Sequence, residues 1–183
     1  MPEALALMQQ ADRARREERP ADAHRDYAEA VRLSRETGNR RELIRALKGL
    51  GQIERDLGNR DAARTACEEA VILCRGENDE LLLAHTVRHL GDIHRESGRA
   101  DLAGPLLREA LGLYGGHAKT APLDLANTLR PLAILEEGAG RVEEAMRLWA
   151  QARDLYAAVG VAEGVEESST RLAALGQTPG KRP

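Results

Sequence analysis

Residues 44–75 read IRALKGLGQIERDLGNRDAARTACEEAVILCR. Apolar residues recur in this stretch at intervals of three and four positions, which predicts two amphipathic helices. Gly58-Asn59 separates the two runs, and a glycine just past a helix can adopt the left-handed conformation that ends it. We therefore expect a helical hairpin, in which the second helix folds back on the first.

The same hairpin recurs along the chain. In its second helix, an alanine is followed by a large or apolar residue four positions on and by another alanine three positions later. The alanines that start this pattern are Ala23, Ala63, Ala103 and Ala145, at spacings of 40, 40 and 42 residues. The first helix repeats as well, with Gly51 and Gly91 at one position. Glycine costs about 1 kcal/mol inside a helix, so close helix packing should offset that cost at both residues.

Composition limits the classes of function. Aromatic residues make up 2% of the chain and Phe is absent, while the apolar set is mainly Leu and Ala, which favours packed helices over β-sheets. The formal net charge of −3 provides no general basic field, so nucleic acid is not an expected partner. No apolar run approaches the ~20 residues that span a bilayer, and no signal peptide is apparent. We expect a cytoplasmic protein with no membrane partner.

The repeated pattern resembles the tetratricopeptide repeat (TPR). In the second copy it is carried by small and apolar residues, namely Leu47, Leu50, Gly51, Gly58, Ala63, Cys67 and Ala70. The period of 40–42 residues exceeds the common TPR period of about 34. It is similar to the longer repeats of kinesin light chains and of many bacterial regulatory proteins. The resemblance covers roughly residues 3–175.

This resemblance implies an all-α fold, a right-handed superhelical solenoid of about four TPR hairpins followed by a C-terminal capping helix. The hairpins are expected at about residues 3–38, 40–77, 79–115 and 121–159, and the capping helix at residues 161–175. Together they would form a single domain over residues 1–176. Residues 177–183, which are rich in Pro and Gly, are expected to form a disordered tail.

In TPR arrays the first helices line a concave groove, and the resemblance places a cation at its central position in three successive repeats. The central residues are Met8, Lys48, Arg88 and Arg130. Neighbouring groove positions hold Arg45, Gln52, Arg55, His85, His89, Asp92 and Asn127. Asn and Gln amides can pair with the backbone of an extended peptide. Lys and Arg can hold its acidic side chains or its C-terminal carboxylate through charge-assisted hydrogen bonds.

We therefore expect a protein–protein interaction scaffold that binds an extended, acidic peptide segment in a basic groove. Two other functions stay open: a regulatory protein that senses a small ligand or peptide, and a self-assembling module such as a homodimer. The groove cations could also be solvated charges that pair with Glu54, Asp56 and Asp92 and contribute little energy.

The sequence offers no catalytic or metal-binding constellation. His85 and His89 are four positions apart, a spacing that metal sites use, but no third ligand accompanies them in the HExxH manner. The few Ser and Thr residues are not placed near a histidine base, and no glycine-rich phosphate loop is present. We expect no metal, no cofactor and no enzyme activity.

Overall fold

The structure, a computed structural model, describes residues 2–177. Within that range the chain forms nine helices and no strand. The helices are α1 (Pro2–Arg16), α2 (Pro20–Glu36), α3 (Arg40–Asp56), α4 (Arg60–Cys74), α5 (Glu80–Glu96), α6 (Ala100–Gly116), α7 (Pro122–Gly138), α8 (Val142–Ala158) and α9 (Ala162–Gly176). The expected tail, residues 177–183, lies outside the described residues except for Gln177.

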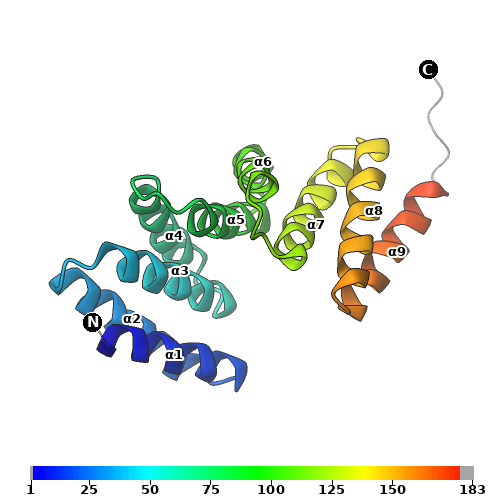
Figure 1. The fold of residues 1–183 in the computed structure, drawn as a ribbon. Coiled ribbons are helices and arrows are strands. Elements are labelled where there is room, and N and C mark those ends of the chain that lie inside the picture. The colour runs from blue at the N-terminus through cyan, green and yellow to red at the C-terminus, as the bar shows by residue number, and fades with distance from the viewer. Residues whose placement is uncertain (1, 178–183) are drawn as a thin grey trace.

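Successive helices pair into four hairpins, and α9 packs against α8. The hairpins stack into an arc (Figure 1), in which α1, α3, α5 and α7 lie on the inner side and α4, α6 and α8 on the outer side. The prediction of an all-α solenoid with a C-terminal capping helix is confirmed. No helix of residues 2–177 is long and apolar enough to cross a membrane.

The turns of the four hairpins share a residue in the left-handed backbone conformation. Gly58, Gly98 and Gly140 adopt positive φ angles of 81°, 73° and 72°, as expected for glycines that end a helix. The first hairpin has no glycine at this turn, and Glu18 takes the left-handed conformation with φ 55°. That conformation is uncommon for a residue with a side chain, so the first turn is the least relaxed of the four.

The two helices of a hairpin approach closely at the repeated glycine. A Cβ atom added to Gly51 would lie 2.4 Å from Cys67 Sγ, and one added to Gly91 would lie 2.9 Å from Leu107 Cγ. Packing therefore explains both glycines. The large residues of the second helices fill the core: Tyr27 is 3% exposed and Trp149 is fully buried. Burying such a side chain contributes roughly 1.5–3 kcal/mol or more.

Candidate functional site

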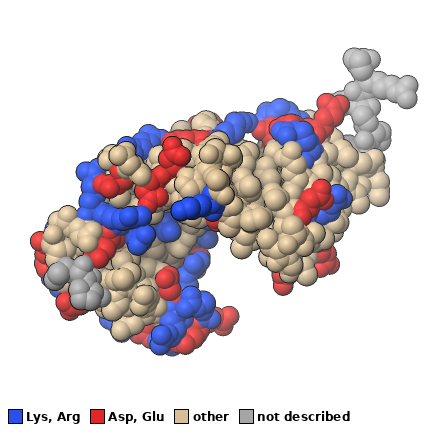
Figure 2. Space-filling model, in the orientation of Figure 1, with Lys and Arg blue, Asp and Glu red and all other residues tan. Residues whose placement is uncertain are grey.

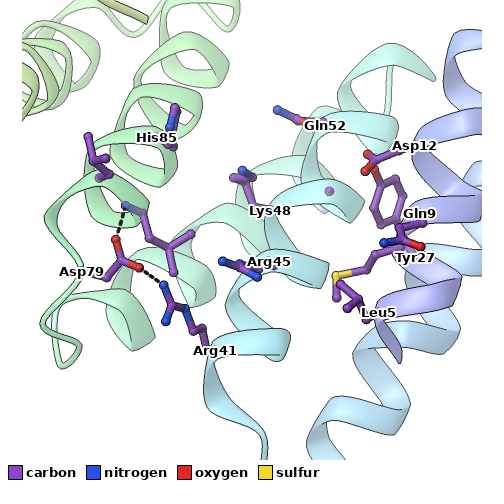
Figure 3. A pocket seen from close by; sticks show the side chains of 14 residues that line it. Leu5, Gln9, Asp12, Tyr27, Arg41, Arg45, Lys48, Gln52, Asp79 and His85 are labelled. Atoms are coloured by element: carbon purple, nitrogen blue, oxygen red, sulfur yellow. Dashed lines mark hydrogen bonds and ion pairs between the residues drawn. The ribbon is translucent and has the colours of Figure 1, made fainter. Parts of the chain in front are cut away.

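A cavity of about 540 Å³ is lined mainly by residues of α1, α3 and α5, the helices on the inner side of the arc. Figure 2 shows the hollow between the N-terminal hairpin and the C-terminal half of the molecule. The cavity is lined by Leu5, Met8, Gln9 and Asp12 of α1, by Tyr27 of α2, by Arg41, Arg45, Lys48, Gly49 and Gln52 of α3, and by Asp79, Leu81, Leu82 and His85 at the start of α5. The side chains of Arg45 and Lys48 extend into the space between α1 and α5 (Figure 3).

A difference between the repeats explains why the cavity lies in the first half of the solenoid. One groove position is held by Leu5, Arg45, His85 and Asn127 in successive repeats. In the last two repeats, a tyrosine of the second helix forms a hydrogen bond with the residue at this position. Tyr114 Oη lies 2.7 Å from His85 Nδ1, and Tyr156 donates a hydrogen bond of 2.9 Å to Asn127 Oδ1.

The first two repeats lack these tyrosines. The equivalent residues are Ser34 and Cys74, which are small and fully buried, so neither can reach into the groove. Arg45 therefore has no partner from its own hairpin and remains available to the cavity. The groove residue of the first repeat, Leu5, is 42% exposed and forms an apolar wall.

The cavity carries two cations without counter-ions. Arg41 forms an ion pair with Asp79, and Asp12 accepts a hydrogen bond from the Tyr27 hydroxyl, so both cavity carboxylates are engaged. Arg45 and Lys48 form no ion pair with any residue of the described part of the chain. An anion that enters the cavity would therefore meet two charges that are not yet satisfied.

The central cation of the third repeat has a different environment. Arg88 contacts Asp92 at 3.3 Å and His89 at 3.1 Å, and Arg95 lies 3.8 Å from the other oxygen of Asp92. Gln52 links this cluster to α3 through a 2.5 Å contact with His89 Nε2. Arg88 is thus paired with a carboxylate of its own helix, as the alternative interpretation expects, but the side chains of this pair are mostly buried and not solvated.

Burial changes the protonation of this cluster. It lowers the pKa of His89 well below its usual 6.5, and the charges of Arg88 and Lys48 act in the same direction. Burial also raises the pKa of Asp92, although Arg88 and Arg95 oppose that shift. Neutral His89 therefore bridges Gln52 and Arg88 at ordinary pH.

The fourth repeat uses its cation to hold the capping helix. Arg130 binds Glu167 of α9 through two contacts, of 2.5 and 2.8 Å. The hydrogen bonds with Glu167 raise the pKa of Arg130, and those with Arg130 lower the pKa of Glu167. Arg55 lies 3.8 Å from Asp56 and 3.9 Å from Glu96.

The structure thus distributes the ten predicted groove residues among three environments. Arg45, Lys48, Gln52 and His85 line the cavity, while Arg55, Arg88, His89 and Asp92 belong to polar contacts between α3 and α5, and Asn127 and Arg130 are bound by α8 and α9. Their role in partner binding stays a prediction. Sequence reasoning missed the apolar walls, although Leu5 shares a repeat position with Arg45. Residues 2–177 contain no group of three His, Cys, Asp or Glu side chains that could hold a metal ion.

The sequence agrees with this geometry: residues 42–116 match the family model of the tetratricopeptide repeat. Residues 42–116 carry tetratricopeptide repeats. Among solved structures, the TPR solenoid is similar to BtubC (BKLC) from P. vanneervenii, with 21% identity and a TM-score of 0.75 over 86% of this chain. It is also similar to the TPR-like repeats of a putative kinesin light chain from Podosopora anserina, with 14% identity and a TM-score of 0.70 over 97% of this chain and 96% of that one.

A third similar structure is the MamA protein, with 19% identity and a TM-score of 0.61 over 96% of this chain and 91% of that one. The match spans 64% of the BtubC chain, which is less than two thirds of its length. No sequence among the curated proteins matches the chain. At these identities the likeness establishes the TPR fold, and it confirms the resemblance to kinesin light chain repeats.

Proposed function

We propose that this TPR solenoid is an interaction scaffold that binds an extended, acidic segment of another protein in the cavity between α1, α3 and α5. The observation that carries the proposal is the pair of cations, Arg45 and Lys48, which lack counter-ions among the described residues. A carboxylate of the partner could form an ion pair with these two side chains without breaking an existing ion pair.

The rest of the cavity wall suits a peptide. Gln9 and Gln52 offer amide groups that can donate to and accept from an extended backbone, whose N–H and C=O groups are otherwise unpaired. Leu5 of α1 and Leu81 of α5 both line the cavity and can contact apolar side chains that flank the acidic residue. The expected ligand is therefore an acidic residue with apolar neighbours, bound in an extended conformation.

We expect the groove cations that the sequence suggests to contribute unequally to partner binding. Arg88 would have to leave Asp92, and Arg130 would have to leave Glu167, before either could bind a partner. Exchange of the partly exposed Arg130–Glu167 pair for another ion pair yields little free energy. Breaking the mostly buried Arg88–Asp92 pair would leave Asp92 without that partner. A new hydrogen bond between ionised groups contributes about 1.5–3 kcal/mol. We therefore assign the main contribution to Arg45 and Lys48, and a smaller one to Arg88 and Arg130.

A peptide selection tests this proposal. A random library of peptides with free C-termini is selected on the wild-type protein and on an Arg45→Gln/Lys48→Gln variant. Arg60→Gln/Arg99→Gln is the matched control, because both arginines are exposed, lie at hairpin turns and do not line the cavity. We expect enrichment of acidic residues on the wild type and the control, and its loss on the cavity variant. Equal enrichment on all three proteins, with unchanged helical circular dichroism, would overturn the proposal.

The apolar walls favour one alternative, a regulator that senses a small ligand. Leu5, Met8, Leu81 and Leu82 all line the cavity, which gives it more apolar surface than the sequence alone indicates. A thermal-shift screen separates the two functions. Stabilisation by small organic acids but by none of the selected peptides would favour the sensor, and the reverse result would favour the scaffold. Sedimentation of the free protein tests self-association, which remains the third possibility from the sequence.

A further inference from the structure

Lys48 differs from Lys119, the other described lysine, in its exposure and its surroundings. It lies in the middle of α3, is partly buried and lines the cavity, and it has no hydrogen bond or ion pair with another described residue. Lys119 lies between α6 and α7 and is exposed. The described part of the chain thus contains one partly buried lysine and one exposed lysine, and the reactivity of Lys48 can be compared with that of Lys119 in the same protein.

The surroundings of Lys48 disfavour a positive charge. The titratable and charged groups around it are Asp12 from α1, Tyr27 from α2, Arg45 from α3, Cys67 and Cys74 from α4, and His85, Arg88 and His89 from α5. Arg41 and Asp79, which form an ion pair with each other, also line the cavity. The other cavity carboxylate, Asp12, already accepts a hydrogen bond from Tyr27. Burial lowers the pKa of Lys48, and the charges of Arg88 and Arg45 lower it further against the opposing effect of Asp12.

A sheltered amine of this kind is a nucleophile. Only the neutral amine attacks a carbonyl carbon, and a lysine that is desolvated beside other cations has a larger neutral fraction than an exposed one. The attack of Nζ on an aldehyde forms a C–N bond and gives a carbinolamine. The carbinolamine then loses its hydroxyl group and the remaining N–H proton as one water molecule, so that one aldehyde and one amine yield one imine and one water. No oxidant or reductant is needed.

Arg45 gives this site a preference among aldehydes. It precedes Lys48 by three residues, so the two side chains leave neighbouring points on one face of α3, one turn apart. Both extend into the cavity, which at about 540 Å³ has room for a small molecule. A guanidinium without a counter-ion binds carboxylate through charge-assisted hydrogen bonds. A carboxylate held at Arg45 would place a carbonyl group of the same small molecule beside Lys48.

We propose that Lys48 is a covalent capture site for small aldehydes that carry a carboxylate, with Arg45 holding the carboxylate while the amine condenses with the carbonyl group. The site is independent of peptide recognition and goes beyond the scaffold function. The modification of Lys48 in this cavity is reversible, because water can hydrolyse the imine.

Reductive trapping on the intact wild-type protein tests the proposal. The probe is glyoxylate with cyanoborohydride, which reduces the imine to carboxymethyl-lysine, and peptide mapping by mass spectrometry measures the rate at each lysine. We expect Lys48 to be labelled about tenfold faster than Lys119, a small part of what holding two reactants together can provide. The rate at Lys48 should also reach half of its maximum at a pH below the ordinary pKa of a lysine side chain.

Propanal is the matched neutral aldehyde, and Arg45→Gln is the matched variant. Loss of the Arg45 charge also raises the pKa of Lys48, which slows its reaction with both aldehydes. Arg45→Gln should therefore reduce glyoxylate labelling of Lys48 several-fold more than propanal labelling, and it should not alter labelling of Lys119. Arg45 is exposed, so this variant is expected to fold. The proposal is overturned if Lys119 reacts as fast as Lys48, or if Arg45→Gln leaves the preference for glyoxylate intact. Failure of the peptide selection would not affect either result.

Discussion

Substitution of Gly51 by alanine tests the close contact that sets the spacing of the central hairpin. A Cβ atom at this position would lie 2.4 Å from Cys67 Sγ and 3.2 Å from the carbonyl oxygen of Ala63. Contacts below 3.0 Å do not occur between real Cβ atoms and their neighbours, so α3 and α4 must move apart or Cys67 must leave its position. Cys67 is fully buried, which leaves its thiol little room to move.

Two effects of opposite sign decide the outcome. Alanine is favoured over glycine in a helix by about 1 kcal/mol. Overpacking a tight core costs about 1–3 kcal/mol. Because one of the two atoms in contact is backbone, we place the cost near the upper end and expect Gly51→Ala to lower the free energy of unfolding by about 1–2 kcal/mol. For a chain of this size, that corresponds to a fall in Tm of roughly 2–8 °C.

The assay is denaturation followed by circular dichroism, with two further variants. Gly112→Ala is the control, because Gly112 is exposed within α6 and no atom lies within 4 Å of its added Cβ. It should raise stability by up to about 1 kcal/mol. Cys67→Ala should relieve the contact, so Gly51→Ala should be much less harmful in the Cys67→Ala background, with a coupling energy of at least about 1 kcal/mol. If Gly51→Ala stabilises the protein as Gly112→Ala does, or if the coupling is absent, the packing argument is refuted.

Three buried groups give further predictions. Burial, together with the charge of Arg88, holds the pKa of His89 well below its usual 6.5, so protonation of His89 favours the unfolded chain. The contribution of His89 to stability should be constant well above pH 6.5 and should fall as the pH drops below that value, and urea titrations at pH 7.5 and 5.5 should show a smaller loss for His89→Gln than for the wild type. Glu136 is 4% exposed and binds Arg108 and Arg141, so Glu136→Gln should cost about 1–3 kcal/mol at pH 7, a loss that urea unfolding measures and that a neutral result would contradict. Burial raises the pKa of Cys67 to about 12, so a thiol reagent at pH 8 should modify it only after unfolding, and rapid modification of the native protein would contradict its position in the core.

The fold is predictable from the sequence because the packing requirement recurs with the period of the repeat. Gly51 and Gly91 occupy the same position and make the same close contact with the second helix, so a comparison of the repeat copies is enough to infer that contact. The first turn is harder to predict, because Glu18 adopts the left-handed conformation where the other turns have glycine.

The candidate site is only partly predictable. The repeat register places Lys48, Arg88 and Arg130 in the groove, and the pairing of Arg88 with Asp92 follows from their spacing of four residues on one helix. The pairing of Arg130 with Glu167 does not, because it depends on how α9 packs against the last hairpin.

The sequence difference that leaves the cavity open is visible in the repeats, but its effect on the cavity cannot be predicted from the sequence. Ser34 and Cys74 stand where the later repeats have Tyr114 and Tyr156, a difference that is visible when the copies are compared. Only the structure shows that the tyrosines reach groove residues, and therefore that their absence leaves Arg45 available.

The most direct test of the central claim is a double-mutant cycle between the cavity and a peptide. The strongest acidic peptide from the selection and its Glu→Gln counterpart are titrated by fluorescence anisotropy against the wild type and against Lys48→Gln and Arg45→Gln. We predict that the peptide substitution weakens binding to the wild type by about 10- to 150-fold, the equivalent of 1.5–3 kcal/mol, and has little effect on at least one of the variants. An equal loss of affinity in all three proteins would show that the acidic residue binds elsewhere, and it would contradict the assignment of this cavity as the partner site.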